Sequence, residues 1–264
     1  MKRNVLIIGA SGGIGKETAK AFIAKGYNVF GCDIKDDNDI QGLHYYKCDI
    51  TKEDDINNLF ININKEIDEL YALIHVAGIY FMDSLLEVSE DELKRVIDIN
   101  FLGATRINRI FFPLLKKGSR IMLTSSEVAP LDPLPFNGIY AMIKTLVEKY
   151  AFSLRMEVNM FDIKVIVLRP GAIDTGLLPE SSKQVQKLCD NTKIHKASSK
   201  RFMNIVNKIE TKSIKPEVLA KFIVKIVSKK NPRYVYKKNN NILLKLLNLL
   251  PDHLETYIIT KIIK

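Results

Sequence analysis

The feature that most constrains the fold of this chain is a glycine-rich segment close to its start. The apolar residues 5–8 lead directly into Gly9-Ala10-Ser11-Gly12-Gly13-Ile14-Gly15, and a helical pattern of apolar residues follows. Glycines at such a junction allow a tight turn from strand to helix and let a phosphate approach the backbone at the helix N-terminus. We therefore predict a dinucleotide-binding loop. Its expected contact residues are Gly9, Ser11, Gly12, Gly13, Ile14 and Gly15.

Short apolar runs alternate with amphipathic stretches along the first two-thirds of the chain. The predicted strands are residues 5–8, 27–32, 43–48, 72–76, 120–124 and 163–168, and the predicted helices are 14–25, 51–67, 89–112 and 140–160. Thr51 and Ser89 are each followed after three positions by an acidic residue, which is typical of a helix N-cap. This alternation predicts an α/β fold, namely a Rossmann-type doubly wound parallel sheet in a three-layer αβα arrangement.

The character of the sequence changes after Pro170-Gly171. Residues 175–211 are polar and weakly periodic, which predicts a mobile substrate loop with short helices. A helix at 216–229 and a short strand at 233–236 are expected to follow. We therefore predict a single dinucleotide-binding and catalytic domain at 1–238 and a helical C-terminal extension at 239–264.

The extension is rich in leucine and isoleucine on both sides of Pro251, which predicts two amphipathic helices hinged there. Leu243, Leu246, Leu247 and Leu250 recur at intervals of three and four residues and form one apolar stripe. Each such side chain gains roughly 1.5–3 kcal/mol when it is buried, so the stripe should meet the protein body, a second subunit or a lipid surface. We favour packing over the substrate entrance, with peripheral membrane contact as the alternative.

Composition excludes several classes of protein. Hydrophobic residues make up 47% and charged residues 27% of the 264 residues, as in globular proteins. The net charge of +10 is spread over scattered cations, which favours a solvated surface over nucleic-acid binding. The 3 cysteines and 4 histidines show no metal-binding spacing, so we expect no metal site. Because the chain shows neither a spanning apolar stretch nor a signal-peptide pattern, we expect a cytoplasmic protein.

An acidic residue bears on the choice of dinucleotide. Asp33 ends the second predicted strand, 24 positions after Gly9, which suits a carboxylate that binds the adenosine ribose. Such a carboxylate accepts hydrogen bonds from the ribose hydroxyls and repels a 2′-phosphate, so NAD is favoured over NADP. In the NADP alternative, Lys16 or Lys35 would contact the 2′-phosphate.

Two motifs together resemble the short-chain dehydrogenase/reductase family: the spacing of Gly9, Gly13 and Gly15, and Tyr140-x-x-x-Lys144. The Tyr-x-x-x-Lys pattern occurs three times in the chain. Only the copy at Tyr140 begins a predicted helix after a strand that ends in serines. The resemblance covers residues 4–236 and implies an NAD(P)-dependent oxidoreductase that interconverts a secondary alcohol and a ketone.

The resemblance also implies roles for further residues. The implied catalytic residues are Asn100, Ser126, Tyr140 and Lys144, and the further implied cofactor contacts are Asp49, Ile50, Ala77, Gly78, Tyr140, Lys144, Pro170, Gly171 and Thr175. Ser126 is favoured over Ser125, which remains the alternative, because its interval to Tyr140 departs less from the family's spacing. Two departures from the family's pattern, Ile8 and His75-Val76, predict altered packing rather than lost chemistry.

Tyr140 and Lys144 suit proton transfer because they lie one helical turn apart and face the same side. A phenol of ordinary pKa is a poor base at neutral pH. We therefore expect the Lys144 ammonium, together with the nicotinamide charge, to lower the pKa of Tyr140. Lys144 would also hydrogen-bond the nicotinamide ribose. Ser126 would hold the substrate oxygen, and Asn100 would hold a water that links Lys144 to solvent.

The substrate is the least determined feature. Phe136-Asn137-Gly138, the loop after Thr175 and the leucine-rich C-terminus resemble the hydroxysteroid- and retinol-dehydrogenase-like branch, which implies a lipophilic alcohol or ketone. The alternatives are a non-catalytic dinucleotide sensor and a peripheral membrane protein that uses the fold as a scaffold. The resemblance further implies a homo-oligomer formed through the helices that carry Asn100 and Tyr140.

Overall fold

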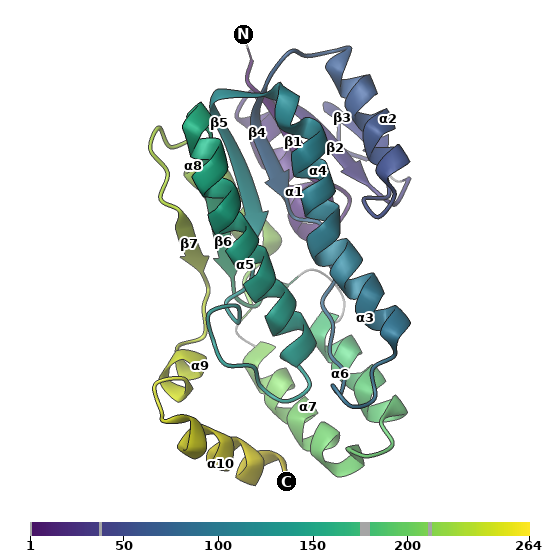
Figure 1. Cartoon of the computed structure of the whole chain (residues 1–264), viewed down its shortest axis with the longest axis vertical. Helices are drawn as coiled ribbons and strands as arrows, with labels where there is room; N and C mark the ends of the chain where they lie inside the picture. Colours follow the sequence, from purple (N-terminus) through teal and green to yellow (C-terminus); the bar gives the residue numbers. More distant parts are fainter. Residues whose placement is uncertain (1, 37–38, 175–179, 211–212) are drawn as a thin grey trace.

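The computed structural model describes residues 2–36, 39–174, 180–210 and 213–264. Within these residues, seven parallel strands form one sheet in the order β3-β2-β1-β4-β5-β6-β7 (Figure 1). The strands are β1 (Asn4–Ile8), β2 (Asn28–Asp33), β3 (Leu43–Lys47), β4 (Leu70–His75), β5 (Leu115–Thr124), β6 (Lys164–Pro170) and β7 (Val235–Lys238). The strand order reverses between β1 and β4. Sheets of this kind bind ligands at that point, outside the carboxyl ends of the strands.

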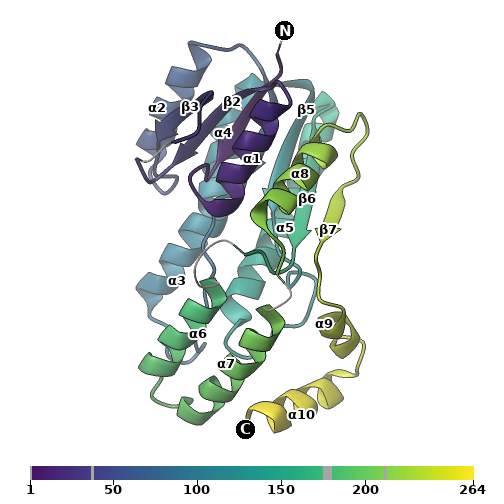
Figure 2. The same cartoon turned by 180° about the vertical axis from the view of Figure 1, so that it is seen from behind.

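Helices cover both faces of the sheet because its strands are apolar on both sides. The helices are α1 (Gly13–Ala24), α2 (Glu53–Asn64), α3 (Glu90–Ile97), α4 (Gly103–Phe111), α5 (Gly138–Val158), α6 (Glu180–Asn191), α7 (Lys196–Glu210), α8 (Pro216–Val227), α9 (Ile242–Leu247) and α10 (Asp252–Ile263), with short 3₁₀ turns at Phe112–Leu114 and Asn159–Phe161. Along β1, Leu6 and Ile8 pack in one cluster with α2, α4 and α5, whereas Val5 and Ile7 pack in another with α1 and α8. The two opposite views show α4 and α5 before the sheet in Figure 1, and α1 and α8 before it in Figure 2. The predicted three-layer αβα fold is confirmed.

One predicted helix is interrupted. Residues 89–112 form α3, a π-helical turn at Asp98–Leu102 and α4, rather than one continuous α-helix. Ser89 caps α3 as predicted, because its hydroxyl accepts a hydrogen bond from the Glu92 N–H at 3.2 Å. The predicted cap at Thr51 is wrong. Its hydroxyl donates to the Asp49 carboxylate at 2.7 Å instead, and α2 begins after Lys52.

The segment predicted as a loop with short helices is more helical than expected. Within its described residues, α6 and α7 span 12 and 15 residues. Val185, Leu188, Phe202 and Val206 lie at helical spacing and are buried in a third apolar cluster that includes Phe136. Polar residues between them mask this periodicity in the sequence. Both helices lie beyond the carboxyl ends of the strands, as Figures 1 and 2 show.

The C-terminal extension contacts the body of the protein. Leu244 and Leu247 of α9 face residues 128–134, and Ile263 of α10 is buried in the third cluster with α7. The predicted leucine stripe is wrong in part, since Leu243 and Leu246 are 67% and 54% exposed. The Asn241 side chain caps the N-terminus of α9, because its Oδ1 atom accepts a hydrogen bond from the Leu243 N–H at 2.9 Å. In the part of the chain that the structure describes, no helix is long and apolar enough to cross a membrane.

Candidate active site

The glycine-rich loop lies between the end of β1 and the start of α1, at the reversal point of the sheet. Gly9 has a φ of +93°, and a Cβ atom there would lie 2.6 Å from the backbone nitrogen of Ala77. At Gly15, a Cβ atom would overlap the carbonyl oxygen of Gly9. Gly9 therefore allows the loop to approach the segment after β4, and Gly15 allows the start of α1 to pack against the loop.

The N-terminus of α1 suits a phosphate group. The residue before the helix is Gly12, which has no side chain to cap it, and the first turn from Gly13 to Lys16 contains no carboxylate. The first N–H groups of a helix have no acceptors within the helix and carry a partial positive charge. The pyrophosphate of a dinucleotide therefore fits this end of α1.

Asp33 ends β2 beside this loop. Its Oδ2 atom accepts a hydrogen bond from the Ser11 N–H at 3.2 Å, and its Oδ1 atom accepts one from the Lys35 N–H at 3.3 Å. The ammonium group of Lys16 lies 2.6 Å from the Asp39 carboxylate. The Asp33 carboxylate is therefore fixed at the loop, while Lys16 is paired with another residue.

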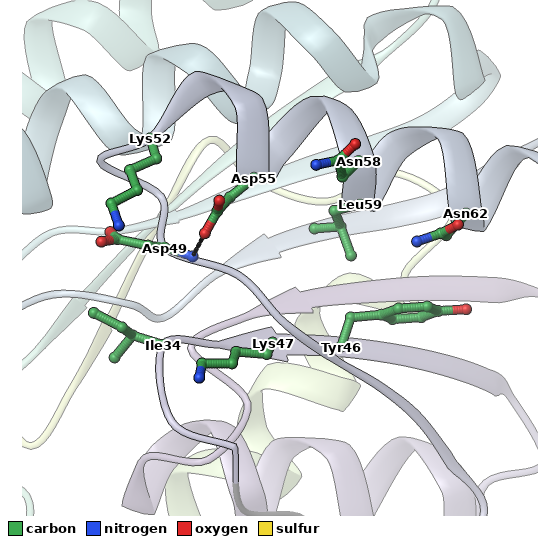
Figure 3. Close-up of a pocket in the computed structure, with 9 residues that line it drawn as sticks. All are labelled: Ile34, Tyr46, Lys47, Asp49, Lys52, Asp55, Asn58, Leu59 and Asn62. Atoms are coloured by element: carbon green, nitrogen blue, oxygen red, sulfur yellow. Dashed lines mark hydrogen bonds between the residues drawn. The ribbon is translucent and has the colours of Figure 1, made fainter.

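A cavity of about 320 Å³ lies between β3 and α2 (Figure 3). Ile34, Asp49 and Lys52 are among the residues that line it. Asp49 accepts hydrogen bonds from the N–H and hydroxyl of Thr51 at 3.0 and 2.7 Å. Figure 3 shows the hydrogen bond of 3.0 Å that the Asp49 N–H donates to Asp55 Oδ2. These bonds hold Asp49 at one end of the cavity.

Three of the predicted catalytic residues meet beyond the end of β5. Tyr140 and Lys144 lie one turn apart at the start of α5, and the Ser126 hydroxyl lies close enough to the Tyr140 phenol to act on its pKa. The Lys144 ammonium lies 5.5 Å from the centre of the Tyr140 ring and donates a hydrogen bond to the carbonyl oxygen of Thr124 at 3.2 Å. Because Ser126 and Lys144 are 9% and 5% exposed, the group is largely shielded from water.

Asn100 lies in the π-helical turn and is buried beside the same group. Its Oδ1 atom accepts a hydrogen bond from the Ile79 N–H at 3.0 Å, and its Nδ2 atom donates to the carbonyl oxygens of Ile79 and Val96 at 3.0 and 3.1 Å. A Cβ atom on Gly78 would lie 2.7 Å from Asn100 Oδ1 and 3.7 Å from Lys144 Nζ. The segment after β4 therefore brings Asn100 and Lys144 together. Single π-helical turns are frequent at functional sites.

Burial shifts the pKa values of both titratable groups. It raises the pKa of Tyr140 to about 12, an effect that the nearby Ser126 hydroxyl only partly opposes. It lowers the pKa of Lys144 to about 8. The predicted lowering of the phenol pKa is thus not seen in the protein alone, because desolvation disfavours the charged form of each group. At neutral pH the phenol of Tyr140 carries its proton.

The two serines after β5 have different surroundings. Ser125 is 1% exposed, and its hydroxyl donates a hydrogen bond to Glu148 Oε1 at 2.7 Å. The Ser126 hydroxyl instead contacts the Tyr140 phenol. These contacts favour Ser126 over Ser125 as the serine that faces a substrate.

The remaining predicted cofactor contacts have different positions. Pro170 ends β6, and Gly171 donates its N–H to the last carbonyl oxygen of β7 at 2.9 Å, so both lie at the carboxyl end of the sheet. The Ile50 side chain packs against Gly103, at the start of α4. Thr175 lies outside the described residues.

Two residues next to the site were not predicted from the sequence. Glu148 and Arg169 form an ion pair beside Ser125, and their side chains are 15% and 16% exposed. Helical spacing could have indicated Glu148, because it follows Lys144 by four positions and shares its face of α5.

His75, one of the departures from the family's pattern, has a packing role. Its Nε2 atom hydrogen-bonds to Asn108 Oδ1 at 2.8 Å, and the Asn108 amide donates to the Tyr150 hydroxyl at 3.0 Å. Burial lowers the pKa of His75 to about 4, so its ring is neutral at physiological pH. The described residues contain no group of three or more His, Cys, Asp or Glu arranged to hold a metal ion.

A family model decides the assignment. Residues 3–186, more than half of the chain, match the model described as short chain dehydrogenase. The chain belongs to the short-chain dehydrogenase/reductase family. Members of this family are oxidoreductases that bind NAD(P) and act on small molecules, and they typically form oligomers.

Comparisons with individual proteins agree with this assignment. The chain is 28% identical over 231 residues to 3-ketodihydrosphingosine reductase of Bacteroides thetaiotaomicron. This alignment covers 87% of this chain and 85% of the relative. The chain is 22% identical to estradiol 17-beta-dehydrogenase 2 of Rattus norvegicus, over 67% of this chain and 50% of the relative.

Solved structures show the same fold. A short chain dehydrogenase family protein from Francisella tularensis has a TM-score of 0.74 at 23% identity, covering 90% of this chain and 97% of that one. Aldohexose dehydrogenase of Thermoplasma acidophilum has a TM-score of 0.73 at 21% identity, covering 93% of this chain and 94% of that one.

Proposed function

We propose that this protein is an NAD-dependent oxidoreductase that interconverts a lipophilic secondary alcohol and its ketone, with Tyr140 as the general acid and base. The observation that carries the proposal is the placement of the Tyr140 phenol beside both the Ser126 hydroxyl and the buried Lys144 ammonium. Reduction of a ketone requires a proton donor and a second hydrogen-bond donor that reach the same oxygen. The hydroxyls of Tyr140 and Ser126 meet this requirement.

A bound nicotinamide dinucleotide supplies or accepts the hydride. The N–H groups at the start of α1 would hold its pyrophosphate. The Asp33 carboxylate would accept hydrogen bonds from the adenosine ribose, and Asp49, at the end of the cavity, would contact the adenine. Because a carboxylate repels a 2′-phosphate, the fixed position of Asp33 supports NAD rather than NADP.

The side chains of the site divide the proton chemistry between them. In reduction, Tyr140 donates its proton to the ketone oxygen, and in oxidation it takes the proton back from the alcohol. Ser126 hydrogen-bonds to the same oxygen and stabilises the charge that develops there. The Lys144 ammonium stabilises the phenolate that remains after donation. Asn100 holds the segment after β4, and the second lone pair of its Oδ1 atom accepts a hydrogen bond from a water that links Lys144 to solvent.

An apolar wall beside the phenol supports a lipophilic substrate. The centres of the Tyr80 and Tyr140 rings lie 4.6 Å apart. Tyr80 also packs against the third cluster, which contains Met82, Phe136 and Phe202. The two relatives described above are named for a ketodihydrosphingosine and for estradiol, which are both lipids.

We also propose that the protein forms a homo-oligomer through α4 and α5. Met142, Leu146, Phe152 and Met156 share one face of α5 and are 51%, 42%, 51% and 62% exposed. Exposed apolar side chains that gather on one face of a helix favour a protein–protein contact there. The molar mass measured by light scattering tests this proposal.

The decisive experiment is a screen of ketones monitored by the absorbance of NADH and, separately, of NADPH. The panel contains 3-ketodihydrosphingosine, estrone and a short-chain ketone, each with the reduced cofactors, and an aldohexose with the oxidised cofactors NAD+ and NADP+. We expect turnover of a lipophilic ketone with NADH. Binding of NADH without turnover of any compound would indicate a dinucleotide sensor, and turnover of the aldohexose alone would contradict the lipophilic substrate.

A further inference from the structure

Glu148 is a buried carboxylate that the proposed chemistry does not use. It lies on α5, four residues after Lys144, and its side chain is 15% exposed. Its Oε1 atom accepts hydrogen bonds from the Ser125 hydroxyl and from Arg169 Nε, both at 2.7 Å. Its Oε2 atom accepts a hydrogen bond from Arg169 Nη2. Three donors from two other elements therefore converge on one carboxylate.

Each partner of Glu148 lies one residue from a residue of the site. Ser125 precedes Ser126, and Arg169 precedes Pro170 and Gly171. The strand ends are also joined directly, since the Ser125 N–H donates to the carbonyl oxygen of Leu168 at 2.8 Å. Glu148 thus connects the helix that carries Tyr140 to the ends of β5 and β6.

The form of this contact favours a geometric role over a purely stabilising one. A buried ion pair loses much of its Coulomb energy to desolvation, so burial of charge is weak support for stability. A bidentate guanidinium–carboxylate contact, in contrast, fixes direction as well as distance. Glu148 is bidentate with Arg169 and uses a further lone pair for Ser125, so rotation of any of the three would break a charge-assisted bond.

We propose that Glu148 is a positioning residue that holds Ser126 against Tyr140 by fixing Ser125 and the end of β6. This inference rests on the proposed function, because it takes Ser126 and Tyr140 as the groups that bind the substrate oxygen. The required precision is high, since a displacement of about 1 Å in a catalytic group can cost about 10²-fold in rate.

The test compares Glu148→Gln with Glu157→Gln, which removes an exposed carboxylate from the same helix. The protein is labelled with ¹³C at tyrosine Cζ, and the Tyr140 signal is assigned from its loss in Tyr140→Phe. We expect Glu148→Gln to move this signal at neutral pH and to lower kcat at least tenfold, with little change in the affinity for NADH. Glu157→Gln should leave the signal and kcat at the wild-type values.

Ser125→Ala provides a second, milder variant in case Glu148→Gln does not fold. It removes one hydrogen bond to the carboxylate and should move the Tyr140 signal in the same direction by a smaller amount. An unchanged Tyr140 signal in a folded Glu148→Gln protein, or in Ser125→Ala if the former does not fold, would overturn the inference. If the signal moves but the wild-type protein reduces no ketone, Glu148 positions Ser126 as inferred, and the proposed function fails instead.

Discussion

The Ser126 hydroxyl, just after β5, lies beside the phenol of Tyr140 at the start of α5. The preceding hydroxyl, on Ser125, lies in the interior and donates to Glu148 at 2.7 Å. Successive residues in an extended segment point to opposite sides, which explains why neighbouring serines have different partners. The Ser126 hydroxyl therefore faces the reacting groups, while the Ser125 hydroxyl links the end of β5 to α5.

This division predicts unequal effects of three substitutions. Tyr140→Phe should lower kcat by roughly 10²–10⁴-fold, the usual range for general acid–base catalysis. Ser126→Ala should lower it by roughly 10²–10³-fold, because one donor to the developing oxyanion is lost. Ser125→Ala should have a much smaller effect. Steady-state kinetics on an identified ketone, together with NADH titrations, measures these changes, and a larger loss for Ser125→Ala than for Ser126→Ala would reverse the roles of the serines.

Asp33 should control the choice of dinucleotide. Replacement by Ala removes a carboxylate that would hydrogen-bond the adenosine ribose, and hydrogen bonds to charged groups contribute about 1.5–3 kcal/mol. We therefore expect Asp33→Ala to weaken NADH binding about tenfold or more and to affect NADPH much less, as measured by fluorescence titration. The control is Asp36→Ala, which makes the same change at an exposed position three residues away. Tighter binding of NADPH than NADH by the wild-type protein would contradict this assignment.

Much of the site could be predicted because its parts are local in sequence. The turn from β1 to α1 and the pair Tyr140 and Lys144 each depend on residues within one turn or one loop. The Glu148–Arg169 pair could not be predicted in this way, since its partners belong to separate elements and meet only after β6 and α5 pack together. The π-helical turn around Asn100 was missed for a similar reason: its side chain bonds to Ile79, 21 positions away, and helical periodicity carries no sign of that contact.

His75 should make the fold sensitive to acid. Burial lowers its pKa to about 4, whereas an unfolded chain takes up the proton near the ordinary value of about 6.5. Between these values the unfolded state binds more protons, so stability falls as the pH decreases from about 6.5 to about 4. From the linkage between protonation and folding, we expect His75 alone to lower the free energy of unfolding by about 2 kcal/mol between pH 7 and pH 5.

Urea unfolding at pH 7 and pH 5 measures this contribution. His75→Asn should reduce the difference in unfolding free energy between the two pH values, even if the variant is less stable at both. His253→Asn, at an exposed position, serves as the control and should retain the wild-type difference. An unchanged pH dependence in His75→Asn would show that other groups cause the acid sensitivity.

Within the C-terminal extension, α9 should stabilise the fold through one of its sides. Leu247 faces residues 128–134, whereas Leu249, two positions later, is 79% exposed. Leu247→Asp places a charge against an apolar surface and should cost about 1–3 kcal/mol, which corresponds to a fall in Tm of roughly 2–12 °C for a protein of this size. Leu249→Asp changes only an exposed side chain and should stay within about 2 °C of the wild type. Because the two variants carry the same charge on neighbouring residues, their difference in Tm isolates the contact between α9 and the body, and equal shifts would mean that α9 does not pack there in solution.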